Sequence, residues 1–311
     1  VSLMSASLLT YMIARPLRRL SLAADRVRTG AAEKLELPSI TKRQDEIGEL
    51  AGSLEAMTAA LFDRIVANEA FAADVAHELK NPLTSIRSAV ETSERVTDPV
   101  AQEKLRKVIA SDVRRLDRLI TDISNASRLE AEVARQPNER FDLSKLLTEL
   151  AETYDAIRDD GDPHVSFRIE EGTESIEVMG REGPLGQVFR NLIENARSFS
   201  PPNGKVMITS QGVKADGRDW IETLVEDEGP GIPPDKLEKI FNRFYTDRPK
   251  GTKFGLNSGL GLSIVLQIIE THRGSVEASN RMDGDGNITG ARFTVRIPAA
   301  PIQRKPANRD N

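Results

Sequence analysis

The hydrophobic period of the chain changes near Pro137, and this change limits what the chain can fold into. Before Pro137, apolar residues recur every three or four positions, which is the period of helices that pack along one face. After Pro137, short β-type runs alternate with helical runs. A chain of 311 residues that carries both patterns is expected to form several domains rather than one core.

Two short apolar seams near the start have the alternating spacing of coiled coils. The first seam consists of Leu17, Leu20, Ala24 and Val27. The second seam consists of Ile47, Leu50, Leu54, Met57 and Leu61. Gly30 ends the first seam, and the stretch from Gly30 to Thr41 is expected to be an extended connector. Helices this short are marginal alone, so a partner chain is expected to cover both seams.

A second pair of amphipathic segments follows, and it predicts an antiparallel helical hairpin. The helical pattern resumes with Phe71, Val75, Leu79, Leu83, Ile86 and Val90 on one face. It returns after a break near Pro99 with Leu105, Ile109, Val113, Leu116, Ile120 and Ile123. Asp98 before Pro99 is expected to cap the second helix. Each hairpin exposes an apolar stripe, so two hairpins are expected to pair into a dimeric four-helix bundle.

The part after Pro137 predicts an α+β sandwich with helices on one face of a largely antiparallel sheet. The expected strands are Val165 to Ile169, Ile176 to Met179, Val206 to Ser210, Ile221 to Val225, Ser275 to Ser279 and Ala291 to Ile297. The expected helices are Leu143 to Ile157, Pro184 to Phe199 and Leu260 to Thr271. The tail from Pro301 is expected to be disordered.

Composition excludes several classes of function. The net charge of −5 argues against a nucleic-acid binder. The absence of cysteine removes disulfides, zinc–thiolate sites and cysteine nucleophiles, and three histidines are too few for a histidine-built metal site. The first 14 residues carry no charge, and Arg15, Arg18 and Arg19 follow them. This positive-inside pattern predicts the end of a transmembrane helix, while a capping helix of a soluble bundle is the alternative.

His77 is a candidate nucleophile. On a helix it lies opposite the stripe that contains Val75 and Leu79, so its ring is expected to be exposed. Glu78 is placed to accept the Nδ1 proton, which leaves Nε2 as the attacking atom. Asn81 lies one turn further along the same face. For a histidine taken alone, a surface position without a role is the alternative.

Three further segments suggest a nucleotide site. Asn191 and Asn195 share a helical face and offer amide oxygens that suit Mg²⁺. Asp227 follows a strand and is able to accept the amino group of adenine, with Gly229 and Gly231 allowing close approach of the ring. The last segment comprises Gly259, Leu260, Gly261 and Leu262 at the start of an expected helix, where backbone amides are able to bind phosphate. Each segment alone has a plain alternative, a surface pair or a turn.

Together these segments resemble the N, G1 and G2 boxes of the GHKL (Bergerat-type) ATPases. The stretch with Phe241, Arg243 and Phe244 resembles the F box of histidine kinases. The segment around His77 resembles their phosphoacceptor box, and Pro16 with Asp45 to Gly48 resembles a HAMP linker. The chain is therefore similar to bacterial sensor histidine kinases of two-component systems, and more narrowly to the alphaproteobacterial ChvG type.

The resemblance implies a domain order. It places the end of a transmembrane helix at 1–14, a HAMP linker at 15–68, a dimerisation and phosphotransfer hairpin at 69–136, a catalytic ATP-binding domain at 137–300 and a disordered tail at 301–311. It implies a homodimer joined through the HAMP linker and the hairpin. The chain would lie on the cytoplasmic side of the bacterial inner membrane.

The resemblance also implies the activity. ATP and Mg²⁺ would bind in the last domain under a lid, Thr246 to Asn257. His77 would take the γ-phosphoryl group and pass it to an aspartate of a response regulator, and Asn81 would orient water in the reverse reaction. Ser198 stands where the family commonly has Lys or Arg, and Arg197, Arg243 and Lys253 are candidate replacements. A GHKL ATPase of another kind and a non-catalytic signalling dimer remain the rival interpretations.

Overall fold

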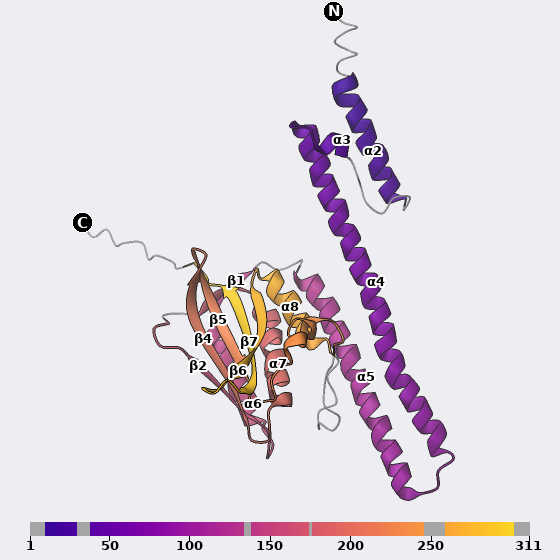
Figure 1. The fold of residues 1–311 in the computed structure, drawn as a ribbon. Helices are drawn as coiled ribbons and strands as arrows, with labels where there is room; N and C mark the ends of the chain where they lie inside the picture. The colour runs from indigo at the N-terminus through magenta and orange to yellow at the C-terminus, as the bar shows by residue number, and fades with distance from the viewer. Residues whose placement is uncertain (1–9, 30–37, 134–137, 174–175, 246–258, 302–311) are drawn as a thin grey trace, which may run out of the picture. The chain divides into compact units, whose positions relative to one another are not determined.

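The computed structural model describes residues 10–29, 38–133, 138–173, 176–245 and 259–301 (Figure 1). The chain divides into two compact units, Val1–Lys80 and Asn81–Asn311. Helix α4 (Glu46–Ser93) passes through the boundary between them. Each unit has a core of its own.

The first unit holds the two short seams. It contains a single π-helical turn η1 (Thr10–Ala14), α2 (Arg15–Arg28), α3 (Pro38–Thr41) and the first part of α4. Its core consists of Leu20, Ile40 and Ala51, with Ala23, Val27, Ile47 and Leu54 packed against it. The prediction of an extended connector is wrong at residues 38–41, where α3 puts Ile40 into this core; residues 30–37 lie outside the described part.

The start of α4 explains the presence of Asp45 and Gly48 at these positions. Asp45 Oδ1 accepts a hydrogen bond from the backbone nitrogen of Gly48 at 3.2 Å, so Asp45 caps the helix. The Arg43 guanidinium also donates to this carboxylate and holds the pKa of Asp45 at about 2. A Cβ at position 48 would lie 2.2 Å from the carbonyl oxygen of Arg43, which excludes every residue except glycine.

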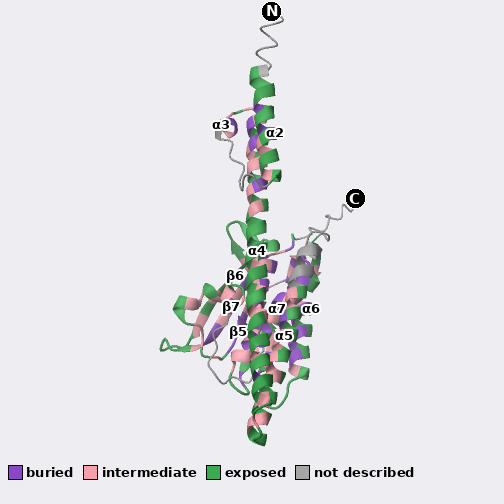
Figure 2. Ribbon diagram, turned by 90° about the vertical axis from the view of Figure 1, so that its right-hand side faces the viewer, coloured by how far each residue is buried: buried purple, intermediate pink, exposed green. Residues whose placement is uncertain are grey.

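The two longest helices are continuous. Helix α4 runs unbroken for 48 residues, so the second seam and the segment from Phe71 to Val90 belong to one helix, which includes Pro82. Helix α5 (Pro99–Val133) begins as predicted, with the Asp98 carboxylate accepting from the backbone nitrogens of Val100 and Ala101. On α4, Leu83 is 55% exposed and Val90 42% exposed, and much of the helix is exposed in this single chain (Figure 2).

The rest of the second unit is an α+β sandwich. Its strands are β1 (Glu139–Asp142), β2 (His164–Ile169), β3 (Glu177–Gly180), β4 (Lys205–Ala215), β5 (Arg218–Glu226), β6 (Ser275–Met282) and β7 (Ile288–Pro298). Its helices are α6 (Leu143–Ala156), α7 (Glu182–Phe199) and α8 (Gly261–Thr271), with short 3-10 turns η2 (Pro234–Lys236) and η3 (Lys239–Phe241).

Five strands form one mixed sheet in the order β2-β4-β5-β7-β6. All neighbours pair antiparallel except β2 and β4, which pair parallel because α7 lies between them in the chain. The fold class is thus confirmed, whereas the small antiparallel pair β1–β3 contains one strand that the sequence did not reveal. The residues from Asp283 to Asn287 form the turn between β6 and β7.

The three helices α6, α7 and α8 pack on one face of this sheet (Figure 1). On α7, the apolar residues Leu185, Val188, Leu192 and Ala196 share one helical face and are all fully buried. This packing leaves the opposite edge of α7, with Asn191 and Asn195, turned away from the densest part of the core. Within the described residues, no helix is long and apolar enough to cross a bilayer.

Candidate functional site

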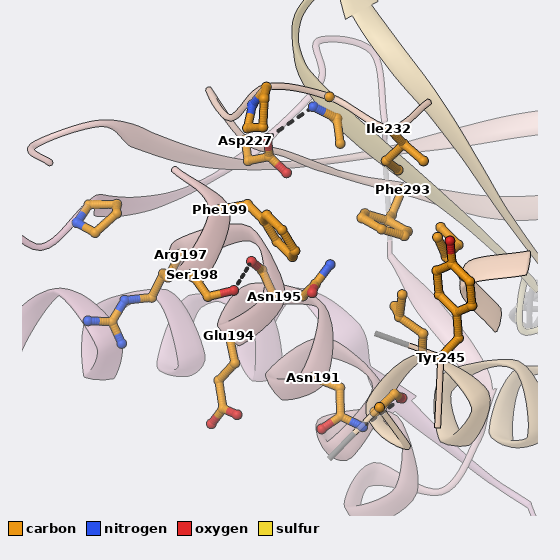
Figure 3. A pocket seen from close by; sticks show the side chains of 18 of the residues that line it. Asn191, Glu194, Asn195, Arg197, Ser198, Phe199, Asp227, Ile232, Tyr245 and Phe293 are labelled. Atoms are coloured by element: carbon orange, nitrogen blue, oxygen red, sulfur yellow. Dashed lines mark hydrogen bonds between the residues drawn. The ribbon is translucent and has the colours of Figure 1, made fainter. Parts of the chain in front are cut away.

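A cavity of about 580 Å³ opens beside α7 in the second unit (Figure 3). Seven of the predicted nucleotide-binding residues line it: Asn191, Asn195, Asp227, Gly231, Gly259, Gly261 and Leu262. They come from α7, the segment after β5 and the start of α8, which are far apart in sequence. The structure therefore brings the three predicted segments together around one space.

Asp227 lies at the top of this cavity in Figure 3 and is only 2% exposed. Its Oδ1 accepts hydrogen bonds from the backbone nitrogens of Gly229 at 2.8 Å and Ala291 at 2.9 Å. Burial raises the pKa of Asp227, while these two hydrogen bonds and Arg281 oppose the rise. One oxygen is thus fixed by the backbone, and the other is directed into the cavity.

Asn191 and Asn195 lie one turn apart on α7 and both reach the cavity. The amide nitrogen of Asn191 donates to the carbonyl oxygen of Gly261, the first residue of α8, at 3.1 Å. This bond links two walls of the site and leaves the amide oxygen of Asn191 as its other polar atom. An amide oxygen on this side is a suitable ligand for a hard cation that also contacts phosphate.

Five predicted residues do not line the cavity: Gly229, Phe241, Arg243, Phe244 and Leu260. Three of them lie directly behind it. The Phe241 ring packs edge to face on Phe293, a lining residue, with centroids 6.4 Å apart. The backbone nitrogen of Phe244 donates to the carbonyl oxygen of Gly259 at 2.9 Å, and Leu260 is buried beside it. The predicted lid and Lys253 lie outside the described residues.

Tyr154 and Glu194 line the cavity and were not named from the sequence, whereas Arg197, which also lines it, was. Tyr154 of α6 donates from its hydroxyl to Glu194 Oε1 at 3.0 Å, and burial and this carboxylate raise its pKa. Arg197 stacks over the Tyr154 ring and donates to Asp162 Oδ2 at 2.8 Å. These contacts join residues of different elements, so the local sequence does not reveal them. The helical period of α6 indicates only that Tyr154 lies on its buried face.

The position of Ser198 is also defined. Its hydroxyl donates to the backbone carbonyl of Asn195 at 2.8 Å, so it closes the helix end rather than pointing outward (Figure 3). Arg197 extends away from Asp227 in the same view. Arg243 is exposed and outside the lining.

The candidate phosphoacceptor group lies on α4. His77 and Asn81 are exposed, and Glu78 is half-buried. Pro82, which follows them, is buried. The predicted exposure of His77 on its helix is therefore confirmed.

The other two histidines, His164 and His272, have structural partners. His272 is buried; its Nδ1 donates to the carbonyl of Ile268, and its Nε2 accepts from the backbone nitrogen of Arg181. His164 pairs with Asp155 at the surface. Among the described residues, no group of three or more His, Cys, Asp or Glu side chains is arranged to hold a metal ion.

Three family models match the chain in succession. The HAMP domain matches residues 8–63, and the His Kinase A (phospho-acceptor) domain matches residues 67–132. The histidine kinase-, DNA gyrase B- and HSP90-like ATPase matches residues 180–301. His77 falls within the second match, and every residue of the nucleotide site named in the sequence falls within the third.

Similar proteins agree with these matches. Sensor protein ChvG of Rhizobium meliloti (strain 1021) is 51% identical over 307 residues, which cover 97% of this chain and 52% of the relative. Sensor protein ChvG of Agrobacterium fabrum (strain C58) is 49% identical and covers 98% and 51%. The chain thus spans about half the length of the curated relatives it matches.

A solved structure is similar as well. The histidine kinase ThkA, in a crystal structure with the response regulator protein TrrA, has a TM-score of 0.56 and 29% sequence identity. The match covers 78% of this chain and 65% of that chain.

Proposed function

The chain belongs to the ChvG-type, HAMP-containing sensor histidine kinases, and on this premise we propose that it transfers the γ-phosphoryl group of ATP to His77. The observation that carries the proposal is the cavity in which Asp227, Asn191, Asn195 and Gly261 meet. A protein that kept only the helical dimerisation role would have no need for a buried carboxylate aimed into such a space.

The residues of the cavity suggest how ATP is held. The Asp227 oxygen that faces the cavity accepts the adenine amino group, and Ile232 and Phe293 supply apolar walls for the ring. Backbone amides at the start of α8, from Gly259 to Gly261, bind phosphate oxygens. The base and the phosphates are thus held by different elements of the sandwich.

Magnesium fits the amide pair. Asn191 and Asn195 present their oxygens on one face of α7, and these atoms would hold the cation together with phosphate oxygens and water. When bound, Mg²⁺ neutralises charge that develops on the phosphates. Asn191 keeps its amide nitrogen on Gly261, so its oxygen is already oriented for this task.

His77 acts as the nucleophile. Nε2 forms a bond to the γ-phosphorus while the bond from that phosphorus to the bridging oxygen breaks, and ADP leaves with the electron pair. Glu78 accepts the Nδ1 proton, which keeps the ring from carrying a second positive charge. The exposure of His77 supports this role, because the ring must meet a nucleotide that another domain holds.

The family supports three further proposals. The phosphoryl group passes from His77 to an aspartate of a response regulator, and Asn81 orients water when the regulator is dephosphorylated. The chain acts as a homodimer, in which the exposed apolar residues of α4 and α5 are covered, including Leu50, Leu61, Leu83, Val90 and Val113. The third proposal is that this end lies at the cytoplasmic face of the inner membrane, which the basic residues after the uncharged N-terminal stretch support.

The experiment that tests the proposal is incubation of the chain with γ-labelled ATP and Mg²⁺. Retention of label by the protein, and its transfer to a response regulator added afterwards, supports a histidine kinase. ATP hydrolysis without any protein-bound label contradicts it and favours a GHKL ATPase of another kind.

A further inference from the structure

We propose that two consecutive residues of β6, Asn280 and Arg281, are positioning residues that hold the segment 227–232 at the adenine end of the cavity. We call Asn280 and Arg281 the brace. The inference rests on the proposed ATP binding and states that the brace contributes to the specificity of the site for adenine. Neither residue lines the cavity. Three residues of the segment do line the cavity: Asp227 at its first end, Gly231 at its bend and Ile232 at its last end.

Arg281 holds the first end of the segment. Its guanidinium donates to the backbone carbonyl of Asp227 at 3.0 Å, and its Nε lies 3.5 Å from Glu226 Oε1. The sheet order places β7 between β5 and β6, so this side chain reaches over a neighbouring strand to the end of β5. The side chain of Arg281 is 27% exposed and that of Glu226 is 8% exposed, so the contact is largely shielded from water.

Asn280 holds the other end. Its Oδ1 accepts from the backbone nitrogen of Ile232, and its Nδ2 donates to the carbonyl of the same residue, both at 2.7 Å. The Asn280 side chain thus satisfies both backbone polar groups of Ile232, as a neighbouring strand would do. The backbone at Gly231 passes close to Asn280, since a Cβ at Gly231 would lie 2.8 Å from Asn280 Oδ1. Gly231 also has a φ of +75°, which favours glycine.

Asn280 and Arg281 are the last residues of β6 before its ladder with β7 becomes irregular, and they pair in regular register with Ala291 and Gly290. Side chains of neighbouring strand residues normally point to opposite faces. The ladder between β6 and β7 shifts register between Arg281 and Met282, at the end of β6. The brace fixes the spacing between the adenine-facing carboxylate of Asp227 and the apolar wall at Ile232.

The expected kinetic signature follows from this geometry. Asn280 and Arg281 hold the adenine end, and within the described residues their side chains form no hydrogen bond to Gly259, Gly261 or the asparagines of α7. Loosening it should weaken ATP binding in the ground state and the transition state alike. The KM for ATP should therefore rise, while the rate at saturating ATP should stay unchanged.

The test uses the full chain with N280D and R281Q. Asn280→Asp keeps the size and the acceptor but cannot donate to the Ile232 carbonyl. Arg292→Gln is the matched control, because Arg292 also pairs with Glu226, at 2.7 Å, and makes no hydrogen bond to the segment 227–232. Asn287→Ala is the second control, since its side chain bonds only within the β6–β7 turn.

We expect each brace variant to weaken ATP affinity about tenfold, in line with one lost hydrogen bond in a buried site. The preference for ATP over GTP should fall, and the autophosphorylation rate at saturating ATP should stay within about twofold of wild type. Arg281→Lys, which keeps a charged donor, should recover part of the affinity. Both controls should match the wild type.

Unchanged ATP affinity in both brace variants would overturn the inference. An equal loss in R292Q, or a fall in the rate at saturating ATP, would show a general structural role instead. Equilibrium dialysis measures ATP affinity without requiring phosphoryl transfer, so the brace can be tested separately from the proposed kinase activity. A wild type that binds ATP without labelling His77 would contradict the kinase proposal and leave the brace to be judged by affinity alone.

Discussion

The Oδ1 atom of Asp227 accepts a 2.9 Å hydrogen bond from the backbone nitrogen of Ala291, 64 residues further along the chain. A second bond from Gly229 occupies the same oxygen. Both donors are backbone groups, so they remain when the side chain at position 227 is replaced. They favour an acceptor oxygen at the position of Oδ1. This asymmetry determines what a substitution at position 227 presents to the cavity.

Asp227→Asn should weaken ATP binding sharply. The two backbone donors will keep the new amide oxygen in place of Oδ1, which turns the NH₂ group toward the cavity. A donor would then face the donor amino group of adenine. We expect a loss of about 1–3 kcal/mol in binding free energy by calorimetry. Asp235→Asn, at an exposed site on η2, is the control; an affinity within twofold of wild type in D227N would refute the adenine contact.

Replacing the α7 amides should raise the Mg²⁺ requirement. Asn195→Ala removes one proposed oxygen ligand, and Asn191→Ala removes a ligand together with the bond to Gly261. We expect both variants to need more Mg²⁺ for half-maximal ATP binding, and N191A to be the more impaired. A titration of Mg²⁺ at fixed ATP checks this. Unaltered Mg²⁺ dependence in both would remove the amides from the metal site.

Glu78 and Asn81 should affect different steps. Glu78→Gln cannot take the Nδ1 proton, and positioned bases contribute ~10²–10⁴ in rate, so autophosphorylation should slow strongly while ATP affinity holds. Asn81→Ala should chiefly impair dephosphorylation of the phosphorylated regulator. Both rates are to be measured side by side. A wild-type rate of labelling in E78Q would reduce Glu78 to a surface residue, and full phosphatase activity in N81A would leave that face as a docking surface alone.

His272 should make the stability of the sandwich depend on pH. Burial lowers its pKa in the folded state, whereas an unfolded chain protonates near 6.5. The unfolded state therefore binds more protons below that pH. The stabilisation is complete above about pH 6.5 and declines as the pH falls toward the lowered folded pKa. The urea midpoint should drop more between pH 7.5 and 5.5 in wild type than in H272Q; equal drops would contradict this.

The sequence predicted most of the elements because local rules dominate them. Asp98 before Pro99 marks the start of α5, and the period through Leu185, Val188 and Leu192 marks the buried face of α7. Asp227 and the asparagines could be found because their motifs are short and continuous. These residues also turn out to line one cavity.

What the sequence missed depends on partners far away in the chain. The strand β1 has four residues and no apolar alternation, and its pairing with β3 alone defines it. The helical turn at Pro38–Thr41 exists because Ile40 packs with Leu20 and Ala51. Asn280 contacts Ile232, 48 residues away in the chain, and no local pattern predicts such a contact.

The most direct measurement is the position of the label after incubation with γ-labelled ATP and Mg²⁺. We predict that the label maps to His77 as an acid-labile, base-stable phosphoramidate. It should be absent from H77Q, whose affinity for ATP should match the wild type, because the residues proposed to hold ATP and Mg²⁺ all belong to the sandwich. Label that persists on H77Q, or that maps to another residue, would contradict the account.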